Sequence, residues 1–436
     1  MQRVVKFITL GCKVNQYETN AMAQKFLEKG YKVIEEYEQN GEKPDICIIN
    51  TCTVTNMSDR KSRQMLRREK ENNKNVIVVA VGCYAQVAKN ELNKIPEIDL
   101  VLGNNEKVNI VKYVEDYINE NENNIEIEDV MQSRLFSDFG DITFTEKTRA
   151  VVKIQDGCDR FCSYCIIPYA RGRVRSRKPE SIISEITKIA EKDIKEVVIT
   201  GIHIASYGKD FKEEYKLIDL LEEINKIDGI ERIRLGSIEP LLITDEFVER
   251  LKKLDKICHH FHLSLQSGCD ETLKRMNRRY TTEQFREIVK RLRNAYNDVN
   301  LTTDIIVGFP GETEEEFEKT YKFLDEIKFY KMHIFKYSQR KGTKAAVMQN
   351  QIPGDIKELR SRRLIELSNK NEFEINQKYI GKKVEVLFEE EKEGVFKGHT
   401  ANYILVYCND EKENLSNKIQ EVECIQNLND HILAKC

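Results

Sequence analysis

Two stretches of the chain alternate short β-branched runs with helical patterns, and this alternation limits the possible folds more than any other feature. In residues 3–118 the apolar runs include Val4 to Leu10, Asp45 to Asn50 and Val76 to Val81, each followed by a segment of helical period. Strands that alternate with helices form parallel sheets covered by helices on both faces. We therefore expect an α/β protein whose N-terminal domain is a doubly wound parallel sheet.

The alternation resumes at Arg149 and continues through six strand–helix units. The expected strands are Val151 to Gln155, Glu196 to Thr200, Arg232 to Leu235, Phe261 to Leu265, Leu301 to Val307 and Met332 to Tyr337. Six such units predict an incomplete (β/α)6 barrel, whose active site lies at the carboxyl ends of the strands.

The remaining segments have other patterns. Residues 119–147 are polar and rich in Asn and Glu, which predicts a linker with one or two short strands. From about Lys378 short alternating strands with Gly and Asn turns predict a small antiparallel β-barrel. We expect domains at residues 1–118, 148–377 and 378–436, with the linker at 119–147.

Three cysteines, Cys158, Cys162 and Cys165, directly follow the first strand expected for the barrel. Thiolates at this spacing can hold three corners of a cubane iron–sulphur cluster and leave the fourth iron open to a reactant. The alternative is a zinc knuckle completed by a distant His or Cys. We interpret the run as a catalytic cluster site.

Three further cysteines, Cys12, Cys52 and Cys83, each follow an expected strand of the first sheet. Parallel strands end along one edge of a sheet, so these thiols should converge there and could hold a second cluster. The alternative is that they are small buried hydrophobic residues, as free cysteines often are. Cys47 lies inside a strand and is expected to be such a core residue.

The formal net charge is only −3, so the chain as a whole does not attract nucleic acid. Any such attraction must come from local clusters of Lys and Arg. One cluster follows Cys52 and the other follows Cys165, and Arg360, Arg362 and Arg363 could extend them. The two clusters are Arg60, Lys61, Arg63, Arg67 and Arg68, and Arg171, Arg173, Arg175 and Arg177. Alternate residues of an extended chain share one side, so the second cluster should present all four arginines together. Both clusters suit RNA phosphates, although such runs are also common on solvated surfaces.

The cellular context follows from what the sequence lacks. The N-terminus has no apolar signal core, and no stretch approaches the roughly 18 apolar residues of a membrane span. The twelve cysteines are neither paired nor dense enough for a disulphide scaffold. We expect a cytoplasmic protein without a membrane partner, whose cysteines bind metal.

Taken together, these motifs resemble the radical S-adenosylmethionine (SAM) methylthiotransferases, over nearly the whole chain. The likeness rests on the run from Cys158 to Arg177 and on the segments around Cys12, Cys52 and Cys83, while Gly398 to Tyr403 is similar to the family's C-terminal TRAM barrel. Within the family, Leu10 to Thr19 and Asp59 to Gln64 look most like the branch that acts on N6-threonylcarbamoyladenosine at position 37 of tRNA.

The resemblance implies an enzyme with two [4Fe-4S] clusters and SAM as cofactors. It implies that Cys158, Cys162 and Cys165 hold the cluster that cleaves SAM to a radical, and that Cys12, Cys52 and Cys83 hold the cluster that delivers sulphur to C2 of the adenine. The anticodon loop of tRNA is then the partner, with the electron donor and sulphur donor unidentified. Alternatives are action on isopentenyladenosine tRNA or on a ribosomal-protein aspartate, or a non-catalytic iron–sulphur protein that binds RNA or senses redox state.

By position at strand ends, Gly201, Ser237, Glu239 and Gln266 are the candidates for holding SAM. Glycines and short polar side chains there suit a small molecule lying across the top of the barrel. The chain departs from the family at one point, because Thr200-Gly201-Ile202-His203 replaces the expected Gly-Gly-Glu-like sequence. His203 is either a ligand contact or a packing residue. The sequence assigns no role to Cys258, Cys269, Cys408, Cys424 and Cys436.

Overall fold

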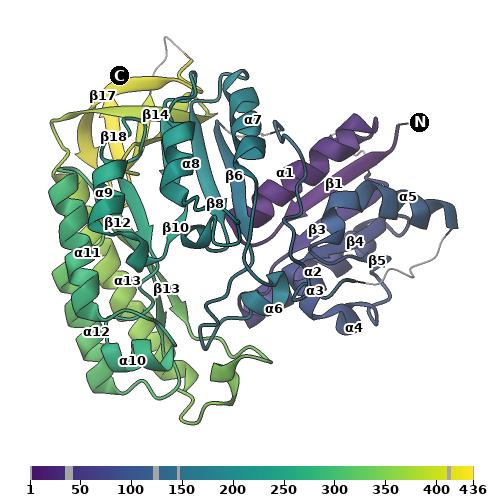
Figure 1. The fold of residues 1–436 in the computed structure, drawn as a ribbon, viewed down its shortest axis with the longest axis horizontal. Helices are drawn as coiled ribbons and strands as arrows, with labels where there is room; N and C mark the ends of the chain where they lie inside the picture. Colours follow the sequence, from purple (N-terminus) through teal and green to yellow (C-terminus); the bar gives the residue numbers. More distant parts are fainter. Residues whose placement is uncertain (1, 35–42, 121–126, 145–147, 410–413, 436) are drawn as a thin grey trace.

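The structure is a computed structural model that describes residues 2–34, 43–120, 127–144, 148–409 and 414–435. The described residues form an N-terminal α/β domain, a central half-closed barrel and a small C-terminal β-barrel (Figure 1). The predicted fold class is confirmed in all three parts.

The N-terminal domain contains a five-stranded sheet in the order β2-β1-β3-β4-β5, and every pair is parallel. Its strands are β1 (Val4–Thr9), β2 (Lys32–Ile34), β3 (Ile46–Thr51), β4 (Ile77–Gly82) and β5 (Leu100–Val101). Its helices are α1 (Lys13–Glu28), α2 (Asn56–Asn72), α3 (Cys83–Val87), α4 (Lys89–Leu92), η1 (Glu106–Asn109) and α5 (Ile110–Glu120). This strand order is that of a doubly wound sheet, as predicted.

Side chains that alternate along the strands pack into two hydrophobic cores, one on each face of the sheet. Phe7 and Ile48 pack with α1 and α5 on one face, whereas Cys47 and Ile49 pack with α2, α3 and α4 on the other. Cys47 is therefore a core residue, as expected. Because both faces are covered by helices, the carboxyl edge of the sheet is left for ligands.

The central domain has six parallel strands arranged as an arc. They are β6 (Arg149–Asp156), β8 (Glu196–Gly201), β9 (Arg232–Leu235), β11 (His260–Leu263), β12 (Asn300–Val307) and β13 (Lys331–Lys336). Two short strands, β7 (Arg175–Ser176) and β10 (Ser237–Ile238), add to the edges of its two four-stranded sheets. The backbone N–H of Cys258 donates to the carbonyl of Ile233 at 2.9 Å and joins the sheets. The six predicted strands are confirmed.

The helices of this domain are α6 (Ile167–Arg171), α7 (Pro179–Ala190), η2 (Ile204–Ser206), α8 (Leu217–Ile224), η3 (Pro240–Leu242), α9 (Asp245–Leu251), α10 (Asp270–Arg275), α11 (Thr282–Ala295), α12 (Glu314–Ile327), η4 (Lys344–Val347) and α13 (Gly354–Gln377). The long helices cover the outer face of the arc, whereas α6 packs against α3 of the N-terminal domain. On β12, Leu301, Ile305 and Val307 pack outward into the main core. Because strand side chains alternate, Thr302, Asp304 and Ile306 face the interior of the arc.

The C-terminal domain is a closed barrel in the order β14-β15-β16-β18-β17. Its strands are β14 (Lys383–Lys392), β15 (Val395–Thr400), β16 (Leu405–Asn409), β17 (Ile419–Asn427) and β18 (Ile432–Lys435). The pairs are antiparallel except for β16 with β18, which is parallel.

This barrel packs against the amino ends of the central strands, away from Cys158, Cys162 and Cys165, which follow the carboxyl end of β6. Arg232 donates to the carbonyl of His399 at 2.9 Å, and Arg234 donates to that of Ala401 at 3.0 Å. The ring of Tyr403 stacks on that of His260 with centroids 4.4 Å apart.

Residues 127–144, the described middle part of the predicted linker, contain no strand. Side chains rather than a sheet bind this segment: Arg177 donates to the carbonyl of Gly140, and the amide oxygen of Gln24 accepts from the backbone of Thr143. The other predicted linker residues include positions 121–126 and 145–147, which lie outside the described residues.

Candidate functional site

The first cysteine set lies at the carboxyl edge of the N-terminal sheet. Cys12 follows β1 and precedes α1, Cys52 follows β3, and Cys83 begins α3 after β4. Strands β1, β3 and β4 are adjacent in the sheet, so the parallel topology brings the three cysteines together. Cys52 and Cys83 are buried, whereas Cys12 is exposed.

A glycine makes this approach possible. Gly11 has a φ of +103°, and a Cβ placed on it would lie 2.8 Å from both the Cβ and the Sγ of Cys52. Only a residue without a side chain fits this left-handed position so close to a thiol. The backbone is held from the side by Asn15, whose amide donates to the carbonyls of Leu10 and Thr51.

The second cysteine set lies in the loop between β6 and α6. The backbone N–H of Cys158 donates to the carbonyl of Gly172 at 3.0 Å, and that of Cys165 donates to the carbonyl of Cys162 at 2.9 Å. All three cysteines are half-buried. Arg278, which the sequence did not single out, donates to the Sγ of Cys162 at 3.5 Å.

Burial disfavours the thiolate form of three cysteines of the two sets. It raises the pKa of Cys52 and of Cys158 to about 11, and that of Cys165 to about 12. A metal centre binds thiolates, so loading either set displaces protons.

One cavity of about 360 Å³ connects the two sets. Cys12 and Thr55 line it from the N-terminal domain, Tyr164 and Cys165 line it from the cysteine loop, and Gln266 and Asp304 line it from strand ends of the barrel. One member of each cysteine set, Cys12 and Cys165, therefore faces the same cavity. This volume lies within the range of small-molecule sites in proteins.

The structure distributes the four SAM candidates over neighbouring strand ends. Gly201 ends β8, Ser237 lies on β10 and is exposed, and Glu239 is buried directly after β10. Gln266 has a φ of +72°, exchanges backbone hydrogen bonds with β12, and lines the cavity.

Glu239 is tied to the cysteine loop through Arg278, which lies 3.0 Å from its carboxylate and also contacts Cys162. His203 lies 3.6 Å from the same carboxylate. Burial alone would raise the pKa of Glu239, but hydrogen bonding to His203 and the charge of Arg278 outweigh it and lower the pKa. An ionised carboxylate thus stands beside the second cysteine set, where it can bind an ammonium group.

The prediction that Arg171, Arg173, Arg175 and Arg177 offer one phosphate-binding side is wrong. Arg171, Arg175 and Arg177 are fully buried, and of the four only Arg173 is exposed. Arg177 lies 2.7 Å from Glu185. Buried arginines of this kind are committed to protein partners and are not available to a ligand.

Arg171 belongs to a buried ionic network between the two domains. Glu18 of α1 lies 2.7 Å from both Arg171 and Lys153 of the central domain, and 2.5 Å from Lys107 of its own domain. Asp156 lies 2.6 Å from Lys153. Burial opposes ionisation of Glu18, but these cations outweigh it and lower its pKa. The Nε of Arg171 also donates to the Sγ of Cys83 at 3.1 Å, so the network contacts the first cysteine set.

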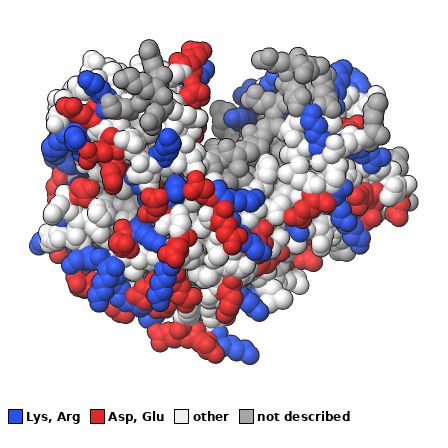
Figure 2. Space-filling view, turned by 90° about the horizontal axis from the view of Figure 1, so that it is seen from above, with Lys and Arg blue, Asp and Glu red and all other residues white. Residues whose placement is uncertain are grey.

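The other predicted cluster does face solvent. Arg60, Lys61, Arg67 and Arg68 are exposed on α2, and four arginines of this helix line a surface groove with Gln64 and Glu71. Arg360 does not extend this surface, since it is buried 2.7 Å from Glu312. On the face shown in Figure 2, basic and acidic side chains are interspersed, so attraction for an anion is local.

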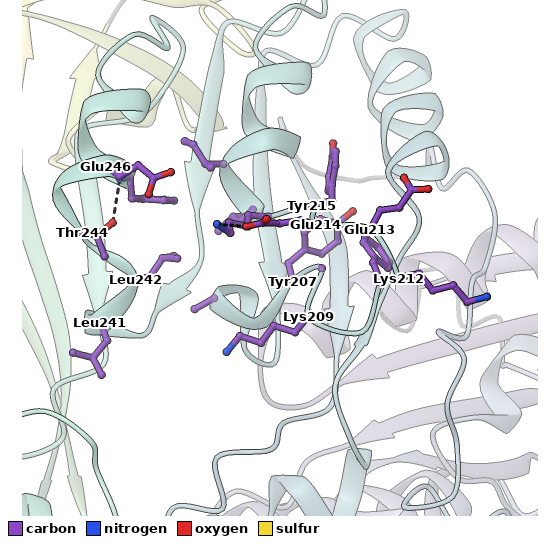
Figure 3. Close-up of a pocket in the computed structure, with 17 residues that line it drawn as sticks. Tyr207, Lys209, Lys212, Glu213, Glu214, Tyr215, Leu241, Leu242, Thr244 and Glu246 are labelled. Atoms are coloured by element: carbon purple, nitrogen blue, oxygen red, sulfur yellow. Dashed lines mark hydrogen bonds and ion pairs between the residues drawn. The ribbon is translucent and has the colours of Figure 1, made fainter.

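A separate groove of about 550 Å³ lies beside η2 and η3 (Figure 3). Its walls include Tyr207, Tyr215 and Leu242, together with side chains of both charges such as Lys209 and Glu246. No cysteine lines it, so this groove lies apart from both cysteine sets. None of the helices in the described residues is long and apolar enough to cross a membrane.

Family models match both α/β parts of the chain. Residues 152–324 match the radical SAM superfamily, and residues 4–103 match the uncharacterized protein family UPF0004.

Full-length relatives are similar over most of the chain. The threonylcarbamoyladenosine tRNA methylthiotransferase MtaB of Bacillus subtilis is 43% identical over 92% of this chain and 89% of its own length. The MtaB of Aquifex aeolicus is 42% identical over 92% of this chain and 95% of its own length. The tRNA-2-methylthio-N(6)-dimethylallyladenosine synthase of Thermoanaerobacter sp. is 38% identical over 87% of this chain and 81% of its own length.

Among solved structures, the radical SAM methyltransferase TsrM of Kitasatospora setae is similar with a TM-score of 0.58 and 17% identity. The alignment covers 80% of this chain and 77% of TsrM. At this identity the likeness concerns the fold alone.

Proposed function

The chain belongs to the radical SAM tRNA methylthiotransferases, and from this we propose that it converts N6-threonylcarbamoyladenosine at position 37 of tRNA to its 2-methylthio derivative. The observation that carries the proposal is the cavity that is lined by one cysteine of each set, Cys12 and Cys165. The identity to the MtaB proteins of Bacillus subtilis and Aquifex aeolicus, 43% and 42%, is higher than the 38% to the dimethylallyladenosine synthase of Thermoanaerobacter sp., and this supports the choice of substrate.

The residues present fit two [4Fe-4S] clusters. Each set supplies three thiols, so each cluster would keep one iron open. We assign one cluster to Cys158, Cys162 and Cys165, and the other to Cys12, Cys52 and Cys83. When bound, the clusters and SAM supply one-electron chemistry and the sulphur that replaces the C2 hydrogen of adenine. An aromatic C–H bond offers no acidic proton, so a general base alone would not suffice.

The residues of the chain bind and orient the reactants. We assign Glu239, which is held by Arg278, to the ammonium group of SAM, and Gly201, Ser237 and Gln266 to the rest of the cofactor. The aromatic rings of Tyr164 and Phe335 line the cavity and provide stacking surfaces for a base turned out of the anticodon loop.

The domains have separate tasks in this proposal. Residues 1–118 hold the sulphur-delivering cluster and present the basic face of α2 to tRNA phosphates, residues 148–377 hold SAM, and residues 378–436 form a TRAM domain. A tRNA substrate places the enzyme in the cytoplasm, where it receives electrons and sulphur from unidentified donors.

The test is a reaction with the protein reconstituted anaerobically with iron and sulphide. It is incubated with SAM, reductant and tRNA carrying threonylcarbamoyladenosine, and the tRNA is digested for nucleoside mass spectrometry. A nucleoside in which methylthio replaces one hydrogen supports the proposal. Conversion of isopentenyladenosine tRNA instead would show that the substrate branch is wrong, and 5′-deoxyadenosine without any modified nucleoside would show that the substrate is another molecule.

A further inference from the structure

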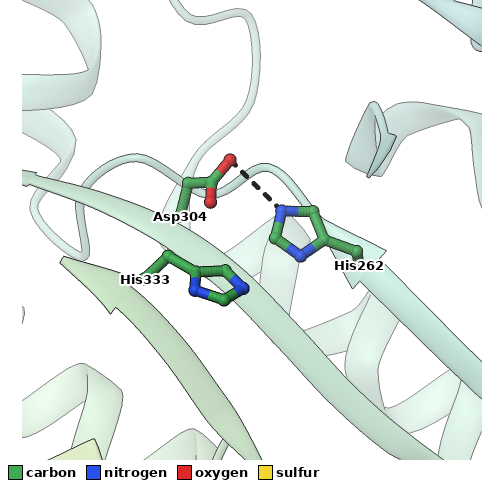
Figure 4. A group of neighbouring side chains, drawn as sticks. All are labelled: His262, Asp304 and His333. Carbon is green, nitrogen blue, oxygen red and sulfur yellow. Dashed lines mark ion pairs between the residues drawn. The ribbon is translucent and has the colours of Figure 1, made fainter. Parts of the chain in front are cut away.

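Three polar side chains outside both cysteine sets converge inside the arc of strands (Figure 4). They are His262 of β11, Asp304 of β12 and His333 of β13. In the strand register Asp304 pairs with His333, while His262 pairs with Thr302, two residues before Asp304. Since strand side chains alternate, this register places all three on the inner face of adjacent strands.

The three groups point at a common centre. One ligand atom from each lies within 4.8 Å of the other two. The Nε2 of His262 is 3.2 Å from an Asp304 oxygen, yet this nitrogen is buried without a hydrogen bond. In a metal site the bonds from the ion to nitrogen or oxygen are about 2.1 Å long, so neighbouring ligand atoms lie about 3 Å apart and point at the ion rather than at each other.

The surroundings hold the ligands in a form that binds metal. The Nδ1 of His262 lies 3.0 Å from the hydroxyl of Thr302, a partner that fixes the ring and can leave the Nε2 lone pair free. Coordination needs an imidazole nitrogen with a free lone pair, which this hydrogen bond leaves available on His262.

We propose that His262, Asp304 and His333 bind a divalent first-row transition metal ion whose open coordination positions face the cavity between the two cysteine sets. Two imidazoles and one carboxylate suit such an ion better than Mg²⁺ or Ca²⁺, which prefer oxygen ligands. Three protein ligands leave positions open, and Asp304 itself lines the cavity. The ion would therefore take an oxygen or nitrogen ligand from the molecule that occupies the cavity.

The experiment uses the full chain with its iron–sulphur clusters reconstituted. Cobalt(II) is added anaerobically, excess metal is removed by gel filtration, and iron and cobalt are counted by mass spectrometry. X-ray absorption at the cobalt edge then identifies the ligands, since sulphur and nitrogen or oxygen scatter differently. The proposal expects one cobalt per chain with only nitrogen and oxygen ligands, and unchanged iron.

Variants locate the ion. Asp304→Asn and His333→Gln should each lose the cobalt, and Thr302→Val should weaken its binding roughly tenfold by freeing the His262 ring. The control is His259→Gln, which alters an exposed His–Asp pair outside the site, with Nδ1 2.6 Å from Asp298. Unchanged iron in each variant shows that the chain is folded.

The proposal would be overturned by cobalt bound through sulphur, by cobalt lost equally from the His259 variant, or by cobalt absent from the wild-type protein. Retention of cobalt in the Asp304 and His333 variants together with a raised KM for tRNA would also overturn it, and would show that these side chains bind the substrate directly.

Discussion

The two cysteine sets are built in opposite ways. Cys158, Cys162 and Cys165 belong to one loop of eight residues, whereas Cys12, Cys52 and Cys83 come from three strand ends and are joined only by the fold of the sheet. In each set an arginine from elsewhere donates to one sulphur, Arg278 to Cys162 and Arg171 to Cys83. The comparison teaches that similar metal sites can depend on local sequence or on tertiary structure, and the two kinds should fail differently.

The sharpest separation comes from removing one cysteine of each set. Cys162→Ala should abolish SAM cleavage, and Cys83→Ala should abolish methylthio transfer while 5′-deoxyadenosine still forms. Each variant should lose the iron of one cluster, because no residue is shared by the two sets. Iron analysis and nucleoside mass spectrometry measure both effects.

Cys258→Ala is the control, since this buried thiol belongs to neither set. Its iron content and activity should equal those of the wild type. Loss of both clusters from either single-site variant would contradict the division into two sites.

Arg171→Gln should damage the tertiary site through the fold. The change leaves the buried carboxylates of Glu18 and Asp156 with fewer cations, a defect that typically costs about 3–5 kcal/mol. We expect a lower urea midpoint and loss of the N-terminal cluster. Arg173→Gln removes an exposed arginine that pairs with exposed Asp159 and lies over the ring of Phe161, so it should change the free energy of unfolding by no more than about 1 kcal/mol. Equal effects of the two changes would refute the role given to the network.

Gly11→Ala tests how closely the tertiary site is packed. The new methyl group would contact Cys52 at 2.8 Å in a left-handed backbone, so we expect a loss of about 2–3 kcal/mol and of the N-terminal iron. The matched control is Gly30→Ala. Gly30 also has a positive φ, +83°, but a Cβ placed on it would have no atom within 4 Å, so the free energy of unfolding should fall by only about 1 kcal/mol. Urea titration and iron analysis decide the matter, and retention of all the iron in Gly11→Ala would show that the site tolerates expansion.

The smallest effect is expected from Arg278→Gln at the local site. The loop keeps its backbone hydrogen bonds, so the cluster should remain, but Glu239 loses a charged partner. The KM for SAM should rise roughly tenfold, as expected for one charged hydrogen bond. Steady-state assay of 5′-deoxyadenosine measures it. Loss of iron instead would show that this set also depends on tertiary contacts.

Sequence reasoning reached the fold and the positions of the six cysteines, because period and strand ends are local signals. It failed for Arg171, Arg175 and Arg177. Alternation shows that these side chains share one side of the chain, but not that Glu18, more than 150 positions away in the case of Arg171, lies on that side. Arg278 gave no signal, since its partners Cys162 and Glu239 are joined only by tertiary structure.

The inner polar triad was missed for a related reason. A period of two predicts that His262, Asp304 and His333 face inward on their strands. Which of them meet depends on the pairing of neighbouring strands, and the register of β11 against β12 and of β12 against β13 is not written in any one segment.

The contact between Arg171 and Cys83 has a consequence for biogenesis. The N-terminal domain leaves the ribosome first, but the arginine that completes its cysteine site lies in α6 and is synthesised later. Until the barrel docks, Glu18 has Lys107 of its own domain but lacks Arg171 and Lys153. The N-terminal cluster is therefore expected to insert stably only after the barrel has been translated. A truncated chain that ends before α6 would not retain the iron of this cluster.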